Sequence, residues 1–382
     1  MARTALIVGA GIGGLTAALA LARRGWDAAV LERARALGDV GAGIQQSPNA
    51  MRVHRALGTA EGVAAAGFAP RAAVIRDGVT GRALVRAPLD DAATRYGAPY
   101  LHVHRADLHR VLLDAARAAG VAVETGAVVT GYEGKRLLTE SGPREADLIV
   151  GADGARSVLR ARMHPGAAPR YTGQTAWRAL VPASVLPKGI IPSDATSWIG
   201  RGGHLVTYYV RGGGLVNVVG VRDDRVWAPE DWSRPGDPHA FRAAFAGWDA
   251  RLEALLGAVE DCRLWGLHDH PPLARWSDGP VTLLGDAAHP MLPFLAQGAA
   301  MAVEDAWVLA DALDGRSVTA GLFLYEARRR PRAARVAAMS AANAKMFHRR
   351  GAWARAKMAL GARLPALPAR AMAGVYAEDV TA

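Results

Sequence analysis

Three glycines near the start of the chain have the spacing of a phosphate-binding turn. Gly9, Gly11 and Gly14 form the pattern G-x-G-x-x-G where an apolar strand pattern at 4–9 meets a helical pattern at 11–24. Gly9 would allow the tight turn, Gly11 the close approach of backbone to a pyrophosphate, and Gly14 close packing of helix on strand. The N–H groups and dipole of the helix N-terminus would attract phosphates. The turn therefore predicts a dinucleotide site.

An acidic residue follows at the distance that such a site requires. Glu32 stands 18 residues after Gly14, at the end of the second strand pattern. A carboxylate there would accept hydrogen bonds from ribose hydroxyls. Because a 2′-phosphate would be repelled, Glu32 favours FAD or NAD over NADP at this site.

Two later strand ends carry polar groups. Asp153 and Gly154 follow a buried strand pattern, and taken alone they predict only a strand end and a helix cap formed by Ser157 or Asp153. Asp286 follows another strand pattern, where it could accept hydrogen bonds from a polyol chain. The helix that begins near Gly298 could stabilise an anion, such as the N1–C2 edge of a reduced isoalloxazine.

His204 and Tyr208 stand four residues apart on a strand pattern. The even spacing places both side chains on one face of a sheet, as the wall of a pocket requires. The alternative is a histidine that only bonds its neighbours in the sheet. Arg178 leaves two interpretations open: it places a positive charge near a flavin or a substrate carboxylate, or it pairs with an aspartate and stabilises the sheet.

The patterns that must position these residues predict an α/β fold. The first strand, the glycine turn, the helix and the second strand follow one another and indicate a parallel crossover. Further along the chain, Asp107 is placed to cap the start of the helix predicted at 107–119. From Tyr171 to Val221 the pattern changes to alternating, aromatic-rich segments typical of an antiparallel sheet, so this sheet is an insertion. The expected strands of the parallel fold are 4–9, 27–31, 121–124, 147–151 and 281–285, and its helices are 11–24, 107–119 and 299–313.

We therefore expect a Rossmann-type domain with a parallel sheet, an inserted domain with a mainly antiparallel sheet, and C-terminal helices. The helical pattern after Gly321 is broken at Pro331, Pro365 and Pro368. The predicted boundaries are 1–70, 100–170 and 275–345 for the discontinuous dinucleotide-binding domain, 71–99 and 171–274 for the substrate domain, and 346–382 for the C-terminal helical segment.

Composition excludes several classes of protein. With 51% hydrophobic residues in a chain of 382, the protein can bury large cores, and its single cysteine, Cys262, cannot close an intramolecular disulfide. We expect a cytoplasmic protein, because no stretch approaches a membrane span and the glycine-rich first helix argues against a signal peptide. The net charge of +11 is spread along the chain, so we expect no nucleic acid partner and, at most, attraction of anionic substrates.

The motifs together resemble the single-component FAD-dependent aromatic hydroxylases, the group-A flavoprotein monooxygenases. Salicylate, 3-hydroxybenzoate and 6-hydroxynicotinate hydroxylases are the most similar. The resemblance covers nearly the whole chain in order. It rests on Gly9–Gly14, Gly41–Gln45 with Ser47–Asn49, His104–Leu108, Asp153–Gly154, Tyr171–Arg178, Gly285–Asp286, Tyr325–Arg332 and Val375–Val380.

The resemblance implies roles for individual residues in FAD binding. Glu32 would hold the adenosine ribose, Arg105 and Asp286 would contact the ribityl and pyrophosphate portion, and Asp153 with Gly154 would serve FAD and the approaching nicotinamide. The full cofactor-binding set expected is Gly9, Gly11, Gly13, Gly14, Glu32, Arg33, Gly43, Gln45, Arg105, Asp153, Gly154, Asp286, Gly298 and Ala299. No second G-x-G-x-x-G exists, so NADH or NADPH would dock transiently.

The resemblance also implies a reaction. FAD reduced by NAD(P)H would react with O2 to form a C4a-hydroperoxyflavin, which would transfer oxygen to a small hydroxylated aromatic or heteroaromatic acid. His204 would be the base that deprotonates the phenol, and Tyr208 would orient the ring or its carboxylate. Gln297 and the loop ending at Pro293 would form the wall on the oxygen-transfer side. His289 is interpreted as structural, bonding its loop.

Some alternatives stay open at this point. The substrate could be a larger polycyclic aromatic, or the protein could be an uncoupled flavin oxidase. We expect no metal, because no His, Cys and carboxylate cluster has ligand spacing. The sequence does not determine which aromatic substrate is used or which ring position is hydroxylated. It also does not decide between NADH and NADPH, or between a monomer and a homodimer.

Overall fold

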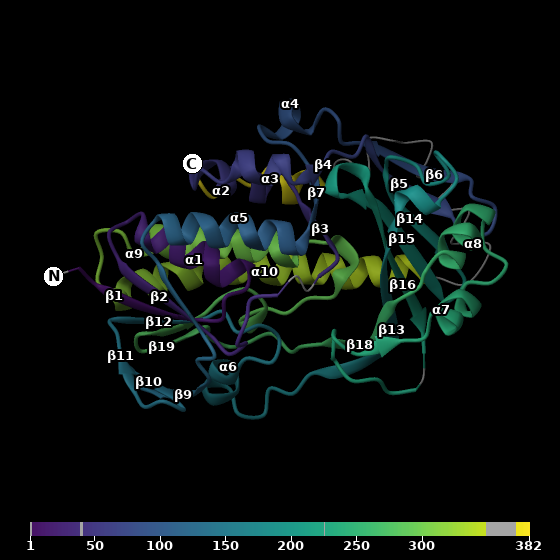
Figure 1. Ribbon diagram of the computed structural model, residues 1–382. Coiled ribbons are helices and arrows are strands. Elements are labelled where there is room, and N and C mark those ends of the chain that lie inside the picture. The colour runs from purple at the N-terminus through teal and green to yellow at the C-terminus, as the bar shows by residue number, and fades with distance from the viewer. Residues whose placement is uncertain (1, 39–40, 225, 349–371) are drawn as a thin grey trace.

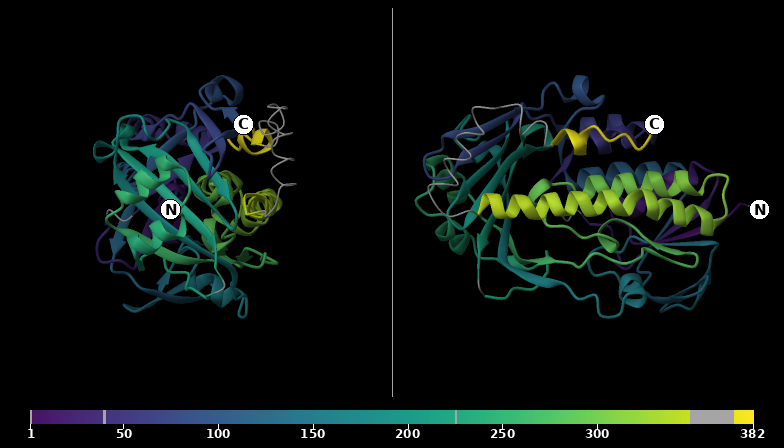
Figure 2. Two further views of the ribbon diagram at one scale, coloured as in Figure 1. Left: turned by 90° about the vertical axis from the view of Figure 1, so that its right-hand side faces the viewer. Right: turned by 180° about the vertical axis from the view of Figure 1, so that it is seen from behind.

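The computed structural model describes residues 2–38, 41–224, 226–348 and 372–382. Two sheets occupy opposite ends of the molecule, and one long helix, α10 (Val318–Phe347), runs from the first to the second (Figures 1 and 2). This arrangement confirms the predicted α/β class with an inserted antiparallel sheet.

The first sheet is the expected parallel one, extended at one edge by a short antiparallel strand. Its strands are short and apolar, and those at its centre are buried on both faces, as is usual for parallel strands covered by other elements. Every neighbouring pair is parallel except β19 with β20. The strand order is β19 (Ser277–Asp278), β20 (Val281–Leu283), β12 (Leu148–Gly151), β1 (Thr4–Val8), β2 (Asp27–Glu32) and β8 (Ala122–Thr125).

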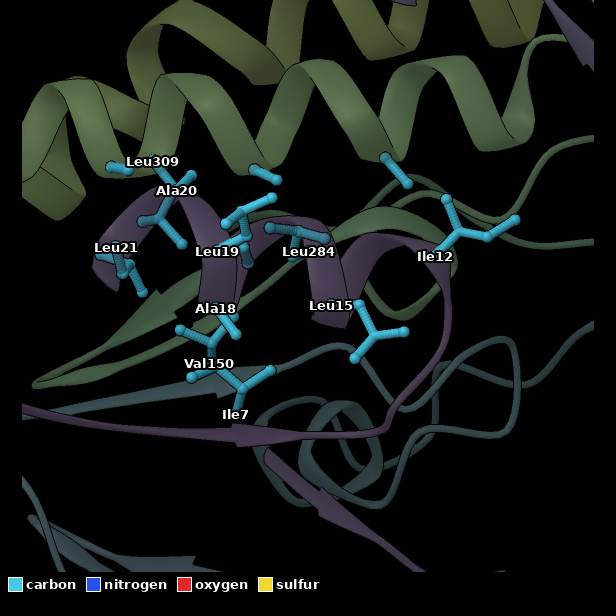
Figure 3. Close-up of a cluster of buried hydrophobic side chains, with 14 of the residues drawn as sticks. Ile7, Ile12, Leu15, Ala18, Leu19, Ala20, Leu21, Val150, Leu284 and Leu309 are labelled. Carbon is cyan, nitrogen blue, oxygen red and sulfur yellow. The ribbon is translucent and has the colours of Figure 1, made fainter. Parts of the chain in front are cut away.

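Helix α1 (Ile12–Ala22) packs between this sheet and helix α9 (Gly298–Leu313) (Figure 3). Its alanines and Gly13 let the two helices approach closely, since a Cβ added at Gly13 would lie 3.2 Å from the Cβ of Ala302 in α9. The same layer contains α5 (Arg105–Ala118), and α6 (Val158–Met163) lies on the opposite side of the sheet (Figure 1).

The second sheet is antiparallel apart from the parallel pairing of β14 with β5. Helices α7 (Pro238–Ala244) and α8 (Ala250–Gly257) cover its outer face through Phe241, Phe245 and Leu252. Its inner face is turned toward the first domain. The strand order is β17 (Pro235–Gly236), β18 (Cys262–Asp269), β13 (Arg170–Pro182), β16 (Leu215–Asp223), β15 (Gly203–Val210), β14 (Ala195–Gly200), β5 (Ala72–Asp77) and β6 (Ala83–Pro88).

Two small sheets and several short helices complete the described structure. The sheet that matters for the site joins the two domains and has the order β3 (Gly43–Gln46), β7 (Leu101–His104) and β4 (Gly67–Phe68). The remaining elements are β9 (Val129–Glu133), β10 (Arg136–Thr139), β11 (Arg144–Glu145), α2 (Pro48–Ala56), α3 (Ala60–Ala65), α4 (Ala92–Tyr96), and the 3-10 turns η1 (Ala183–Val185), η2 (Arg211–Gly213), η3 (Gly285–Ala287) and η4 (Pro293–Leu295).

The prediction that Asp107 caps α5 is wrong. The helix begins at Arg105, so Asp107 lies inside its first turn. Its buried carboxylate instead accepts from Arg211 Nε at 2.9 Å and from Arg110 Nη2 at 2.8 Å. The aspartate therefore ties α5 to the turn after β15.

The predicted break at Pro331 is also wrong, because α10 passes through this residue without interruption. A proline costs a helix one hydrogen bond and a steric clash. Here Arg329 and Arg332, on either side of Pro331, both bind the buried Glu304 of α9, and these contacts hold the helix on its course. Pro365 and Pro368 lie outside the described residues, as does most of the predicted segment 346–382.

Candidate active site

The glycine turn between β1 and α1 has the geometry of a phosphate cradle. Gly9 has φ +103°, and a Cβ there would lie 2.5 Å from the Ala152 carbonyl oxygen. A Cβ at Gly14 would lie 1.9 Å from the Gly9 carbonyl oxygen, whereas a Cβ at Gly11 would meet no atom within 4 Å. Among the described residues, no side chain caps α1, and its first turn has no acid. The turn thus leaves open space and free N–H donors where a pyrophosphate would bind.

Glu32 lies beside this cradle at the end of β2. Its carboxylate accepts from the Ala10 N–H and the Ala34 N–H, both at 2.9 Å. These bonds hold the carboxylate at the edge of the turn, where the predicted ribose would lie. The neighbouring Arg33 is exposed.

The turn after β12 caps helix α6 through both of the residues that the sequence suggested as caps. Ser157 caps α6 by accepting from the Arg160 N–H at 2.9 Å, and Asp153 Oδ2 accepts from the Val158 N–H at 2.8 Å. Asp153 Oδ1 is buried and has no hydrogen-bond partner in the part of the chain that is described. Burial raises the pKa of this carboxyl. Gly154, at φ +78°, leaves the turn open beside it.

Asp286 lies between two positive features at the carboxyl end of β20. A Cβ at Gly298 would come within 3.8 Å of its Oδ1, so the carboxylate faces the first residues of α9, Gly298 and Ala299. Burial raises the pKa of Asp286, and the charges of His289 and Arg105 oppose this shift. Arg105 is exposed at the start of α5, where its side chain covers Gly41.

Gln297 and Pro293 occupy the loop before α9, and the structure gives them different surroundings. Gln297 is buried, and its Nε2 donates to Ser47 Oγ at 3.0 Å while its Oε1 accepts from Asn49 Nδ2 at 3.2 Å. Its side chain thus links α9 to α2. Pro293 is exposed at the start of η4, and Ser340 of α10 holds the loop by donating to the Leu292 carbonyl at 2.6 Å.

A buried ionic cluster braces the two long helices beneath this loop. Glu304 of α9 binds Arg329 and Arg332 of α10, and also accepts from Asn49 Nδ2 at 2.6 Å. Asp305 binds Arg329 at 2.7 Å and His289 at 2.5 Å. The predicted structural role of His289, bonding its loop, is therefore confirmed.

The inner face of the large sheet carries the predicted base and its companion. His204 and Tyr208 of β15 share this face with Arg178 of β13 and Asn217 of β16, because their strands are paired in register. Asn217 Oδ1 accepts from the Gly43 N–H at 2.8 Å, and a Cβ at Gly43 would lie 2.4 Å from the Tyr208 ring. β3 is therefore seated directly on Tyr208.

Gln45 and Tyr208 are set in a buried polar layer between the two domains. The Tyr100 hydroxyl donates to Gln45 Oε1, and the His102 ring lies 4.4 Å from the Tyr208 ring. Burial raises the pKa of Tyr208 to about 12, so its hydroxyl keeps its proton at neutral pH.

His204 is enclosed and uncharged. It is 2% exposed, between the rings of Phe294 and Phe347. Burial and the neighbouring His348 hold the pKa of His204 well below its usual range. Its Nδ1 lies 2.8 Å from His348 Nε2, and His348 Nδ1 lies 2.6 Å from Asp223 Oδ1.

For Arg178, the sequence allowed two interpretations: a positive charge near a flavin or a substrate carboxylate, or a partner of an aspartate in the sheet. No acidic side chain pairs with it among the described residues, and its Nε is buried without a hydrogen-bond partner there. Its guanidinium lies 5.6 Å from the Trp265 ring centroid, and the charges of Tyr208 and Arg105 act on it. Within the described residues, the structure therefore does not support the interpretation in which Arg178 pairs with an aspartate and stabilises the sheet.

Sequence reasoning missed His348, Asp223 and Gln174 as parts of the site. They come from α10, β16 and β13, and the separations from His204 along the chain match no motif spacing. The described residues contain no group of three or more His, Cys, Asp or Glu side chains that could hold a metal ion. No described helix is long and apolar enough to cross a membrane.

The chain is similar to known proteins over most of its length. Residues 2–196 and 228–340 match the model of the FAD binding domain family. The chain is 41% identical over 350 residues to the 3-amino-4-hydroxybenzoate 2-monooxygenase PtmB3 of Streptomyces platensis, covering 90% of this chain and 88% of the relative. It is 38% identical to the 3-hydroxybenzoate 6-hydroxylase 1 of Aquipseudomonas alcaligenes (91% and 90%), and 36% identical to the 6-hydroxynicotinate 3-monooxygenase of Bordetella bronchiseptica (87% and 89%).

Solved structures share the fold over the whole chain. The structure of Klebsiella pneumoniae HpxO with FAD and uric acid superposes with a TM-score of 0.85 at 26% identity, and a salicylate hydroxylase substrate complex superposes with a TM-score of 0.82 at 26% identity. Each match covers 99% of this chain and 96% of the other.

Proposed function

The chain belongs to the FAD-binding-domain family of flavoprotein monooxygenases, and we propose that it hydroxylates the ring of a small hydroxylated aromatic acid with NAD(P)H and O2. FAD, reduced by the nicotinamide, would supply the activated oxygen that attacks the ring. A benzoate with a ring hydroxyl is the favoured substrate class, because relatives at 36 to 42% identity are named for hydroxybenzoates, aminohydroxybenzoates and hydroxynicotinate.

The residues present fit FAD. The open space at Gly11 and the uncapped start of α1 suit the pyrophosphate, and Glu32 suits the adenosine ribose. The unpartnered Asp153 Oδ1 is a buried acceptor that a donor on a ligand would satisfy. Asp286 and the N-terminus of α9 lie together at the next strand end, where the ribityl chain and the flavin ring edge would be held.

One arrangement carries the choice of substrate: His204, Tyr208 and Arg178 share the inner face of one sheet, and no described acidic side chain pairs with Arg178. Burial lowers the pKa of His204 and raises that of Tyr208, which favours the neutral form of both. An aromatic ring activated for attack must lose its phenolic proton, and uncharged imidazole can take that proton at Nε2. A half-buried cation such as Arg178, which no described acid pairs with, would be stabilised by a ligand carboxylate. Tyr208 would donate to the bound acid.

Aromatic side chains on the same face would exclude water from the bound ring. Phe294 and Phe347 enclose His204, and Trp265 packs beside Arg178. The loop that carries Phe294 is fastened to α10 by Ser340 and Asn343, which donate to backbone carbonyls of Leu292 and Phe294. Exclusion of water favours oxygen transfer to the ring over release of H2O2.

The test is NADH and NADPH oxidation by the FAD-loaded protein with a panel of acids. The panel contains 3-amino-4-hydroxybenzoate, 3-hydroxybenzoate, 4-hydroxybenzoate, salicylate and 6-hydroxynicotinate. H2O2 and the product mass are measured in the same reactions. We expect one acid to stimulate oxidation strongly and to gain one oxygen atom with little H2O2. Stoichiometric H2O2 with every acid would instead assign the protein as a flavin oxidase.

A further inference from the structure

We propose that His348 and Asp223 form, together with His204, a proton relay that carries the substrate proton from the ring site to solvent. The inference rests on the proposed function, in which His204 takes that proton. It adds two residues, from the end of α10 and the end of β16, that meet His204 only in the folded chain.

The three side chains form a continuous hydrogen-bonded line. His204 Nδ1 lies 2.8 Å from His348 Nε2, and His348 Nδ1 lies 2.6 Å from Asp223 Oδ1. The line runs from enclosed to open: the exposed fraction is 2% for His204, 8% for His348, and 33% for the Asp223 side chain. A proton delivered to Asp223 has therefore reached solvent.

The carboxylate sets the tautomer of both imidazoles. A carboxylate oxygen accepts, so His348 Nδ1 must carry the proton in this bond. His348 Nε2 then carries a lone pair and accepts from the Nδ1–H of His204. His204 Nε2 is left as the unprotonated nitrogen, and no described residue donates to it. The carboxylate thus selects the tautomer that a base needs, as second partners of histidine commonly do.

The transfer balances without any other reactant. The O–H bond of the substrate breaks and an N–H bond forms at His204 Nε2. The proton on His204 Nδ1 passes to His348 Nε2, and the proton on His348 Nδ1 passes to Asp223 Oδ1. Each imidazole ends neutral with its tautomer exchanged, the substrate becomes a phenolate, and Asp223 releases one proton to water.

Gln174 of β13 supports both ends of this transfer. Its Nε2 lies 3.4 Å from Asp223 Oδ1 and 3.1 Å from His348 Nδ1. It can donate to the carboxylate before the transfer, and to the vacated His348 nitrogen afterwards. The other elements packed on the line contribute Phe294 from η4 and Phe347 from α10. In the described structure, His348 and Asp223 are therefore the titratable groups that face His204 along this line.

The first test is the pH dependence of turnover in Asp223→Asn, Asp223→Glu and the exposed control His239→Gln, using the holoenzyme and the acid found in the panel. For Asp223→Asn we expect kcat to fall by about 10- to 100-fold at pH 6, with KM within about twofold, as for other partners of a functional histidine. The deficit should shrink as the pH approaches about 10, where a phenol ionises unaided. Asp223→Glu should restore part of the rate, and the control should match wild type.

A loss of rate that is equal at every pH, or an unchanged rate, would overturn the relay. The second test does not depend on turnover. Nitrogen-15 NMR of the histidine rings should show His204 with its proton on Nδ1, and this tautomer should be lost in His348→Phe and weakened in Asp223→Asn. A wild-type His204 protonated on Nε2 would also overturn the relay. If no acid of the panel is hydroxylated, the proposed function fails, and the NMR result decides the relay alone.

Discussion

Replacing Arg178 by methionine should separate a binding cation from a structural one. Arg178 lies on the inner face of the large sheet with a buried Nε that has no partner among the described residues. Methionine has a similar length and no charge, so it removes the cation without leaving a large cavity. The two interpretations of Arg178 predict opposite effects on folding and on ligand binding.

The magnitudes follow from the surroundings of the guanidinium. Arg178 is half-buried with a buried Nε, so removing its charge, which no described acid pairs with, relieves about 1–2 kcal/mol of desolvation. Loss of the contact with the Trp265 ring, 5.6 Å away, costs about 0.5–1 kcal/mol. The free energy of unfolding of the protein without substrate should therefore stay level or rise by about 1 kcal/mol. A desolvated bond between guanidinium and carboxylate contributes about 2–4 kcal/mol, so the Kd of an aromatic acid should rise by about 30- to 1000-fold.

The assay compares two ligands that differ only in the carboxylate. 3-Amino-4-hydroxybenzoate and 2-aminophenol are titrated into the FAD-loaded protein, with flavin absorbance or fluorescence as the signal. Arg178→Met should weaken binding of the acid and leave binding of the phenol within about threefold. Arg222→Met is a matched control, because Arg222 lies over Phe245 on the outer face of the same sheet.

Equal weakening of both ligands, or a loss of more than about 2 kcal/mol of stability, would refute the reasoning. Either result would mean that Arg178 supports the sheet rather than a carboxylate. Loss of FAD with unchanged selectivity between the two ligands would instead assign the cation to the flavin.

Three further predictions concern the cofactor cradle and the buried ionic cluster. Gly11→Ala should change the free energy of unfolding of the apoprotein by no more than about 1 kcal/mol, because the added Cβ would meet no atom within 4 Å. The same substitution should weaken FAD binding at least about tenfold, measured by calorimetry, because the backbone could no longer approach the pyrophosphate. Unchanged FAD affinity would contradict the phosphate cradle. Glu304→Gln should cost about 3–5 kcal/mol in urea unfolding, because two buried arginines then lose the negative charge that they bind. Glu124→Gln alters an exposed pair with Arg144 and should cost under about 1 kcal/mol; similar losses in the two variants would contradict the role of burial. Burial raises the pKa of Asp305, but the charges of His289 and Arg329 outweigh this effect and hold the pKa at about 2. The ionised carboxylate should therefore contribute roughly 2 kcal/mol of stability above about pH 4, and this contribution should be lost as the pH falls toward 2. Asp305→Asn should have a flatter curve of stability against pH in this window, and an unchanged curve would argue against the lowered pKa.

The fold could be predicted from the sequence where the signal is local. The parallel strands, the glycine turn and the alternating pattern of the inserted sheet depend on side-chain periodicity and on the conformational freedom of glycine, and both are readable over short windows. The predictions failed at Asp107 and Pro331, where a tertiary contact outweighed a local preference. Asp107 binds Arg211 instead of capping α5, and α10 continues through Pro331 because buried ion pairs hold it on both sides.

The candidate site was predictable only in part for the same reason. His204 and Tyr208 share a strand, so their spacing alone places them on one face. His348, Asp223 and Gln174 come from three other segments, and their hydrogen bonds depend on how α10 and the large sheet meet. The missing partner of Arg178 is likewise a property of its surroundings, since a sequence contains many acids with which it could have paired.

The sequence by itself determined the class of fold, the dinucleotide turn and the family, because these depend on periodicity, glycine positions and motifs read along the chain. The tertiary structure decided which charges are paired, which polar atoms are left without partners, and which tautomer of His204 the line to Asp223 favours. Those properties depend on burial and on contacts between residues distant in sequence, and no local pattern encodes them.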